Sequence, residues 1–356
     1  MTTFSAAELQ HKVKNGELIS ACNLDGLDLQ GCDLSGGVFQ DVSLNCANLQ
    51  AVYLHETVFN ECRLTGITMN GAQLKETVFN DSEMSAISAC DIVMKQCIFN
   101  QCELSNGDFS HSKLDTTQFM RCSLRGSSFS RATLDRTTFF ECSLEATLLE
   151  RCSCLLTTFF NIDLRATDLS QSQFDRAVFF NCDQRGKNYA QQRFISCQFT
   201  DNQLDAVNFS GAQLTQCNFK GASLKQAKLH KVNANQTLFM NADLTGADCQ
   251  DSLFDQALFI GAALSRADFS QSRLFQSILQ QVKAEDACFS MCDLTYSDFS
   301  GANLRRADFR HAVFSRTRFH LAQQEGAHFS GRSGILEYDE ELLAAEAWSL
   351  QHQSRR

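Results

Sequence analysis

Residues 302–311 read ANLRR followed by ADFRH. In each pentapeptide a large apolar residue, Leu304 or Phe309, stands two positions after a small one. Side chains two apart on an extended segment point the same way, so we expect these two to face inward and the other three outward. The pattern fits neither a helix, with its period of about 3.6, nor a long strand, with its period of about 2. It predicts a very short strand followed by a corner, many times over.

The five-residue spacing extends from Leu24 to Phe329, and 51 of its 62 candidate core positions hold Leu or Phe. A longer period lies within it, because every twentieth residue from Phe39 to Phe319 is phenylalanine except Leu279. We call these positions the Phe column. Residues one turn apart in a parallel coil stack at about 4.8 Å, and a turn of twenty residues stacks like on like. The sequence therefore predicts four sides per coil and about 15 coils that bury their core only by stacking.

The A(D/N)LXX pattern resembles the pentapeptide-repeat family over about residues 19–330. The resemblance implies an all-β fold, a right-handed quadrilateral parallel β-helix. We expect three segments: a capping helix at 1–18, the β-helix at 19–330 and a helix at 331–356. Ser5 and Glu8 have the spacing of a capping box, which predicts the first helix. The last helix is interpreted as a lid over the final coil or a dimer contact, or both, through Leu342, Leu343, Trp348 and Leu350.

The composition favours a cytoplasmic protein, and the family resemblance implies a bacterial one. There is no proline, which suits a wall whose backbone N–H groups all pair between coils. No stretch is apolar enough to span a membrane, and residues 1–16 lack the basic start and apolar core of a secretory signal. The net charge is -10, but acidic and basic residues alternate, so no basic stripe predicts direct nucleic-acid binding.

The 17 cysteines are interpreted as small apolar core residues with free thiols, as in a reducing cytosol. Cys154 and Cys249 take large core positions. Twelve more take the small inward position: Cys22, Cys32, Cys62, Cys97, Cys102, Cys122, Cys142, Cys152, Cys182, Cys197, Cys217 and Cys292. The sequence contains no paired CxxC motif, and its eight histidines are scattered. It therefore predicts no metal site. No nucleotide-binding or hydrolase motif is present, and a filled interior leaves no substrate cavity. We expect no enzymatic activity, no catalytic residue and no cofactor.

The repeat is weakest at two places. Between Met84 and Met94 the residue Ala89 stands in a large core position, which predicts a loosely packed coil or a flexible contact site. Between Asp183 and Arg193 a glutamine, Gln184, takes a core position. Burial of polar groups is costly, so we expect this side to bulge outward around Gly186. Such a loop would offer a contact made of Arg185, Gly186, Lys187 and Tyr189.

Apolar residues also flank the Phe column at positions that should face outward. This surface is predicted to bind a partner or a second copy of the chain, centred on Phe140, Phe160 and Phe180. The other candidate residues of the surface are Met120, Val178, Leu238, Met240, Leu258 and Ile260.

The function expected first is a rigid scaffold for protein–protein interaction, with a partner of unknown identity or as a homodimer. Two alternatives come from the family resemblance. One is a DNA mimic that protects a type II topoisomerase, with DNA gyrase as its partner. The other is an accessory or effector of a bacterial secretion system. DNA mimicry needs dense, ordered negative charge, since DNA carries one charge per about 1.7 Å, whereas the charges of this chain are sparse and mixed in sign.

Overall fold

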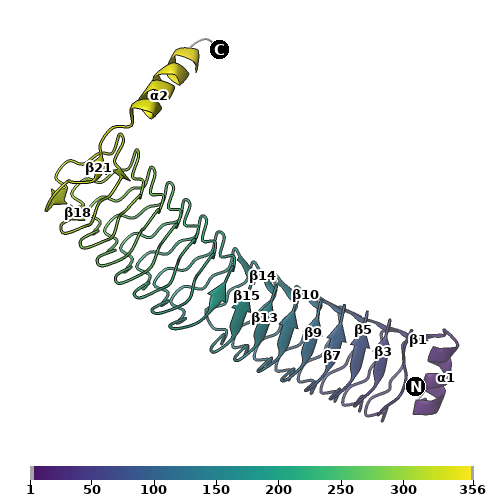
Figure 1. Cartoon of the computed structure of the whole chain (residues 1–356). Coiled ribbons are helices and arrows are strands. Elements are labelled where there is room, and N and C mark those ends of the chain that lie inside the picture. The colour runs from purple at the N-terminus through teal and green to yellow at the C-terminus, as the bar shows by residue number, and fades with distance from the viewer. Residues whose placement is uncertain (1–3, 354–356) are drawn as a thin grey trace. The chain divides into compact units, whose positions relative to one another are not determined.

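The computed structural model of the chain describes residues 4–353, and the chain divides into two compact units, Met1–Asp183 and Gln184–Arg356. Each unit is a parallel β-solenoid, with about 16 turns in the chain altogether and a short helix at each terminus. Figure 1 shows the strands of the first unit stacked coil upon coil. The parallel β-helix expected from the sequence is confirmed.

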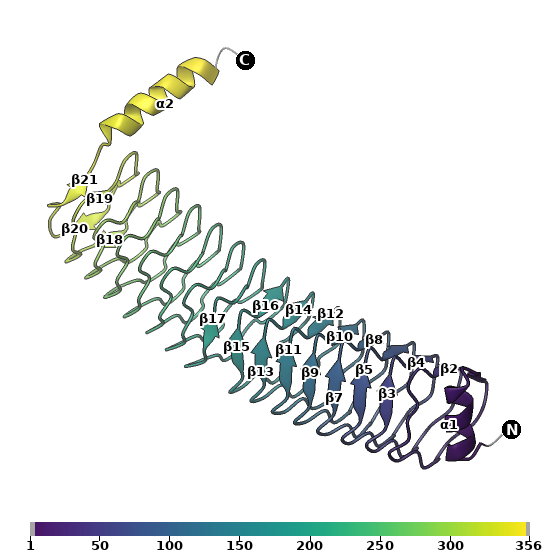
Figure 2. The ribbon, with the colours of Figure 1, turned by 45° about the vertical axis from the view of Figure 1, so that its right-hand side comes forward.

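Unit 1 begins with helix α1 (Ala6–Lys14), and two of the four sides of its coils carry three-residue strands (Figure 2). The side of the Phe column, called the Phe-column side, carries β1 (Leu18–Ser20), β2 (Val38–Gln40), β4 (Val58–Asn60), β6 (Val78–Asn80), β8 (Ile98–Asn100), β10 (Gln118–Met120), β12 (Thr138–Phe140), β14 (Thr158–Phe160) and β16 (Val178–Phe180), hydrogen-bonded in that order. The side before it along the chain carries β3 (Tyr53–His55), β5 (Gln73–Lys75), β7 (Val93–Lys95), β9 (Lys113–Asp115), β11 (Thr133–Asp135), β13 (Ser153–Leu155) and β15 (Gln173–Asp175).

Unit 2 has the same coil, but single β-bridges replace most of the strands. Its named elements are β17 (Phe194–Ile195), β18 (Asp308–Phe309), β19 (Thr317–Arg318), β20 (His328–Phe329), β21 (Ile335–Leu336) and α2 (Glu340–Gln353).

The register of the strands confirms the twenty-residue coil. Phe59 pairs with Phe79, and Phe79 with Phe99, in parallel strands. Inside the coil their rings stack with centroids 4.9 Å apart in both steps. In unit 2 the rings of Phe199 and Phe219 stack in the same way at 4.8 Å. The Phe column is therefore a stack of rings in each unit, interrupted in unit 2 by Leu279.

Nearly every corner of the coil is made by a residue in the left-handed conformation, and Ala166 is an exception among the described corners. All described non-glycine residues with positive φ stand two positions after a core position, for example Glu61 at 52° and Gln101 at 53°. This conformation brings Cβ close to the following carbonyl oxygen, and it is worst for β-branched residues. Among these described corners, accordingly, none is Val or Ile, and Thr116 alone is β-branched.

The small inward position holds groups that hydrogen-bond to the backbone. The hydroxyl of Thr157 donates to the carbonyl oxygen of Leu134 at 2.6 Å, and the thiol of Cys142 donates to that of Phe119 at 3.2 Å. Because buried hydroxyl and thiol groups find an acceptor here, Ser, Thr and Cys can exchange with Ala. All 17 cysteines are free, and of the twelve expected at this position all are buried except Cys32.

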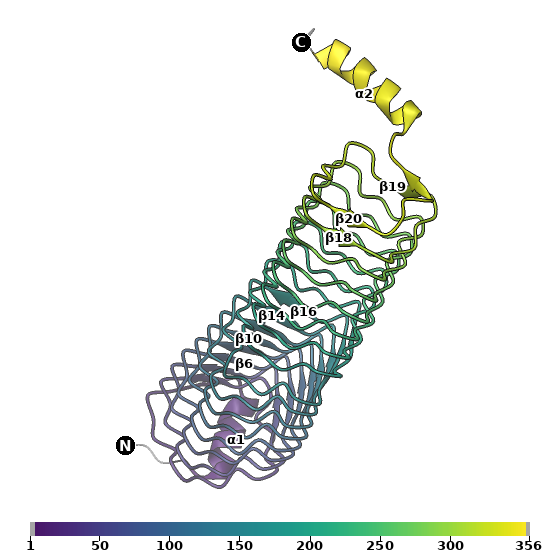
Figure 3. The same ribbon diagram turned by 90° about the vertical axis from the view of Figure 1, so that its left-hand side faces the viewer.

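Helix α1 closes the N-terminal end of unit 1 and lies across its first coils (Figure 3). Its capping box is formed, since Ser5 N–H donates to Glu8 Oε2 at 2.8 Å and Glu8 N–H donates to Ser5 Oγ at 3.3 Å. Leu9 and Val13 are buried. The predicted capping helix at this end is confirmed.

At the C-terminal end the solenoid continues past residue 330, where the sequence predicted its limit. Thr317 pairs with Ile335, so the final coil has eighteen residues instead of twenty. Gly334, with φ of 89°, makes the tight turn, and a Cβ there would lie 2.2 Å from the carbonyl oxygen of Phe314. The glycine-rich segment therefore shortens the last coil before the chain leaves it.

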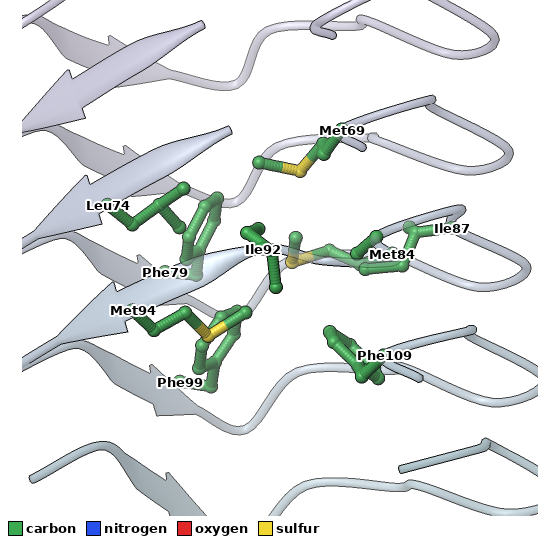
Figure 4. Close-up of a pocket in the computed structure, with 10 residues that line it drawn as sticks. Met69, Leu74, Phe79, Met84, Ile87, Ile92, Met94, Phe99 and Phe109 are labelled. Atoms are coloured by element: carbon green, nitrogen blue, oxygen red, sulfur yellow. The ribbon is translucent and has the colours of Figure 1, made fainter. Parts of the chain in front are cut away.

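The coil around Ala89 is the loosely packed one that the sequence predicted (Figure 4). Met84 and Met94 reach into the space left by the missing large side chain, and Ile87 and Ile92 fill small inward positions. The remaining gap has no room for a water molecule. The flexible methionines, and isoleucines at positions that hold small residues in other coils, thus fill most of the space. The region belongs to the interior and is not a contact site.

Candidate interaction surface

Four outward residues at the ends of neighbouring strands on the Phe-column side form what we call the outer Phe ladder: Met120, Phe140, Phe160 and Phe180. The Phe140 and Phe160 rings stack at 4.8 Å with 11° between their planes, and the Phe160 and Phe180 rings at 5.3 Å, also at 11°. Each ring directly follows a core phenylalanine, so alternation along the strand points it away from the interior. The in-register parallel pairing then places the outer rings one above another.

The members of the ladder are half-buried, because each ring covers part of its neighbours. Val178 lies beside them at the start of β16, also half-buried. The row that precedes the core phenylalanines is less uniform, since Gln118, Thr138 and Thr158 interrupt it between Ile98 and Val178. The structure therefore brings the predicted central residues of the surface together in unit 1. They form one aromatic row, and a row of mixed apolar and polar residues lies next to it.

Unit 2 carries an apolar row of its own on the Phe-column side. Leu238 bridges to Leu258 and Leu258 to Ile278, in parallel register. Met240 and Ile260 follow the core phenylalanines of the same coils, and all five side chains are half-buried. The predicted residues Leu238, Met240, Leu258 and Ile260 are thus neighbours within unit 2.

Charged residues border the outer Phe ladder at the corners of the same side. Arg121 pairs with Glu141 at 3.0 Å. Across the ladder, Arg136 pairs with Asp135 at 3.2 Å and Arg176 with Asp175 at 3.0 Å. These pairs are exposed, and each contributes little to stability. They give the ladder a rim of mixed charge, and the sequence prediction did not single out any of them.

The bulge expected around Gly186 is wrong. Gly186 N–H donates to Asp205 O at 2.9 Å, and Lys187 N–H to Gln184 O at 3.1 Å, as in any other corner of the coil. The segment stays regular because the polar core residues satisfy one another. Gln184 Nε2 donates to Asn202 Oδ1 at 2.9 Å, and the Tyr189 hydroxyl donates to Gln184 Oε1 at 2.6 Å. Tyr189 is only 1% exposed, so it cannot be part of a surface contact.

Helix α2 does not bury its described apolar side chains. Leu342 and Leu343 are each 38% exposed and Trp348 is 63% exposed, which does not support the interpretation as a lid. The side chain of Leu350 lies outside the described residues. The dimer contact expected of this helix stays a prediction.

In the described part of the chain, no three residues among His, Cys, Asp and Glu come together in a group that could hold a metal ion. None of the described helices is long and apolar enough to cross a membrane.

Burial raises the pKa of the Cys152 and Cys182 thiols to about 12, so both are neutral and unreactive in the folded chain. Cys46 is the exposed thiol, at a corner of unit 1.

Two family models match the repeats. The model described as pentapeptide repeats (8 copies) matches residues 22–60, 117–153, 191–221, 208–246 and 222–259, and the one described as a pentapeptide repeat region matches residues 252–329. Together they cover more than half of the chain. The chain belongs to the pentapeptide-repeat family. A comparison with curated proteins finds none that matches.

Several solved structures of pentapeptide-repeat proteins are similar to the chain. HetL, involved in heterocyst differentiation regulation in the cyanobacterium Nostoc sp. strain PCC 7120, is 17% identical, with 80% of this chain and 98% of HetL covered and a TM-score of 0.27. QnrB1, a plasmid-mediated fluoroquinolone resistance protein, is 13% identical, with 58% and 92% covered and a TM-score of 0.31. Rfr23 from the cyanobacterium Cyanothece 51142 is 15% identical, with 44% and 91% covered and a TM-score of 0.13. Likenesses this distant do not define a common site.

Proposed function

We propose that the chain is a non-enzymatic scaffold that binds another protein through the outer Phe ladder. The observation that carries this proposal is the stack of Phe140, Phe160 and Phe180 outside a core that is already filled. The core phenylalanines stabilise the coil, whereas the outer rings remain partly exposed to water. An apolar row of this kind, bordered by charged residues, is typical of a protein-binding surface.

The outer Phe ladder is also well suited to binding because its side chains are preorganised before a partner arrives. Each ring is held between its neighbours and stands on a strand that is hydrogen-bonded on both sides, as β14 is to β12 and β16. A partner that covers such rings immobilises few side chains that were free before. Aromatic residues, phenylalanine among them, are enriched in the cores of protein interfaces.

The substitution Phe160→Asp tests this function. It places a carboxylate in the middle of the ladder, while the side chain points away from the core and the coil should still form. We expect loss of cross-linked partners identified by mass spectrometry from the native host, or of self-association in sedimentation velocity if the partner is a second copy. Ser153→Asp adds the same charge at an exposed position of β13, on another side of the coil, and should change neither result.

Equal circular dichroism spectra of the two variants would show that the fold is kept. If Phe160→Asp then retains every interaction of the unmodified chain, the interface lies elsewhere and the proposal fails.

A DNA mimic is not favoured by the surface, because arginines pair with the carboxylates along the coil, as Arg125 does with Glu145 at 3.5 Å and Arg306 with Asp286 at 2.7 Å.

A further inference from the structure

Two neighbouring coils of unit 1 have a carboxylate at each end of the Phe-column side. The sequence reads ETVFNE at 56–61 and ETVFND at 76–81. Glu56 and Glu76 stand at the corner before β4 and β6, and Glu61 and Asp81 at the corner after them. All four are exposed. We call the outward surface of β4, β6 and β8 between these corners the acidic strip.

The centre of the acidic strip is apolar on one side and neutral polar on the other. Val58, Val78 and Ile98 form a half-buried row one coil apart. The amides of Asn60 and Asn80 run beside it, and Asn80 Nδ2 donates to Asn60 Oδ1 at 2.9 Å. This bonding fixes the amides in place and leaves the valine–isoleucine row as the surface that gains most from being covered.

The carboxylates are poorly neutralised within the chain. Glu76 has Lys75 at 3.4 Å, whereas Glu56, Glu61 and Asp81 make no ion pair with any cation of the described residues. Carboxylates one coil apart repel each other, and salt at physiological concentration screens charges only beyond about 8 Å. A partner that brings positive charge along both corners would relieve this repulsion.

The spacing of the row indicates what kind of segment fits. One coil step is 4.9 Å between Phe59 and Phe79 and again between Phe79 and Phe99. An α-helix advances about 5.4 Å per turn, so its apolar residues at i, i+4 and i+7 nearly match one coil each. An extended segment places side chains on one face about 6.6 Å apart and falls out of step with the row.

We propose that the acidic strip binds a cationic amphipathic helix of a protein partner, lying along the solenoid with its apolar row on Val58, Val78 and Ile98. The inference rests on the proposed function and adds the charge and the shape of the partner. Lysine or arginine residues flanking the apolar row of the helix then face Glu56 and Glu76 on one side and Glu61 and Asp81 on the other. Further along, the outer Phe ladder has arginines at its corners and does not share this preference.

Two synthetic helical peptides serve as probes. Both have the same row of leucines at i, i+4, i+7 and i+11, with lysines flanking the row in one and glutamates in the other. In fluorescence anisotropy at low salt we expect the lysine peptide to bind at least about tenfold more tightly than the glutamate peptide. The affinity of the lysine peptide should fall as salt is raised, because the charges lie at the surface.

The triple variant Glu56→Lys, Glu61→Lys and Asp81→Lys should remove or reverse the preference. The matched control is Glu83→Lys, Asp91→Lys and Glu103→Lys, which changes net charge equally at outward positions on other sides of unit 1 and should keep the preference. Val78→Ser, which removes apolar surface from the row without adding charge, should weaken binding of the lysine peptide in otherwise unchanged protein.

Three results would overturn the inference: no binding of the lysine peptide at low salt, equal binding of both peptides, or equal loss in the control variant. Self-association through the strip, abolished by the triple variant with no peptide binding, would assign the surface to a second copy instead. The proposed function is judged separately, since Phe160→Asp lies outside the strip. If the peptide test fails while Phe160→Asp still removes an identified partner, the scaffold function stands and the partner is not a cationic helix.

Discussion

The hydroxyl of Tyr189 donates a hydrogen bond to Gln184 Oε1 at 2.6 Å in the interior of unit 2, where both side chains are almost completely buried. Gln184 is also hydrogen-bonded to Asn202, one coil further on, so the three side chains form a buried polar cluster. A core built on leucine and phenylalanine thus tolerates three polar side chains, because they are satisfied together.

Removing one member of this group should be costly. Tyr189→Phe deletes the donor to Gln184 Oε1 and keeps the ring, so we expect the free energy of unfolding to fall by about 1–3 kcal/mol. Denaturant unfolding followed by circular dichroism measures the change. Replacing all three residues by those of neighbouring coils, as Gln184→Leu, Tyr189→Phe and Asn202→Ala, should restore most of the loss or exceed it. A single variant as stable as the unmodified chain would contradict the role given to the bond.

Phenylalanines inside and outside the same strand should differ sharply in their effect on stability. Phe139 is fully buried between Phe119 at 5.2 Å and Phe159 at 5.3 Å, so Phe139→Ala should lower the free energy of unfolding by about 3–5 kcal/mol. Its neighbour Phe140 faces outward, and Phe140→Ala should cost less than about 1.5 kcal/mol. Chemical denaturation of the two variants compares them directly. Similar losses would mean that the outer ladder, too, is part of the structural core.

The sequence was sufficient for the coil because its information is periodic. A leucine or phenylalanine at every fifth position implies one inward direction per side, and like residues at every twentieth position imply the stack. Gln184 shows where this reasoning stops. A polar residue in a core position predicts a break when taken alone, but its partners Tyr189 and Asn202 occupy adjacent core positions, five and eighteen residues away. The left-handed corners escaped prediction for a different reason, since Asp, Glu, Gln, Arg and Ala all occupy them.

Thr116 offers a test of the strain at the corners. It has φ of 54° and a β-branched side chain in a conformation that suits asparagine and glycine. Thr116→Asn should therefore raise the free energy of unfolding by about 0.5–1 kcal/mol. Gln96→Asn, at the equivalent corner of the previous coil, removes no branched residue and should gain less stability than Thr116→Asn. An effect of equal size at both positions would indicate that branching is not the cause.

Stability should fall in alkaline solution because of the buried thiols. Burial raises the pKa of Cys152 and Cys182 to about 12, whereas an unfolded thiol ionises near about 8.5. Between these values the unfolded chain loses protons that the folded chain keeps, so the contribution is full below the unfolded pKa and is lost as the pH rises toward 12. Under reducing conditions, the unfolding midpoint should decrease from pH 8 to pH 11. Cys152→Ala should flatten this decrease, and Cys46→Ser, at an exposed corner, should not.

The left-handed corner that recurs at five-residue spacing, with the exception of Ala166, also constrains how a gene for this protein can change in length. Inserting or deleting one pentapeptide in unit 1 keeps every corner intact, but it turns all later positions of the unit by one side of the square. Phenylalanines would then meet leucines in the neighbouring stack, and the outer rings would be divided between two faces. Only a change of twenty residues, such as the spacing of Phe139 and Phe159, leaves all columns aligned. Duplication of whole coils is therefore the route by which the solenoid can lengthen and still keep one uninterrupted surface.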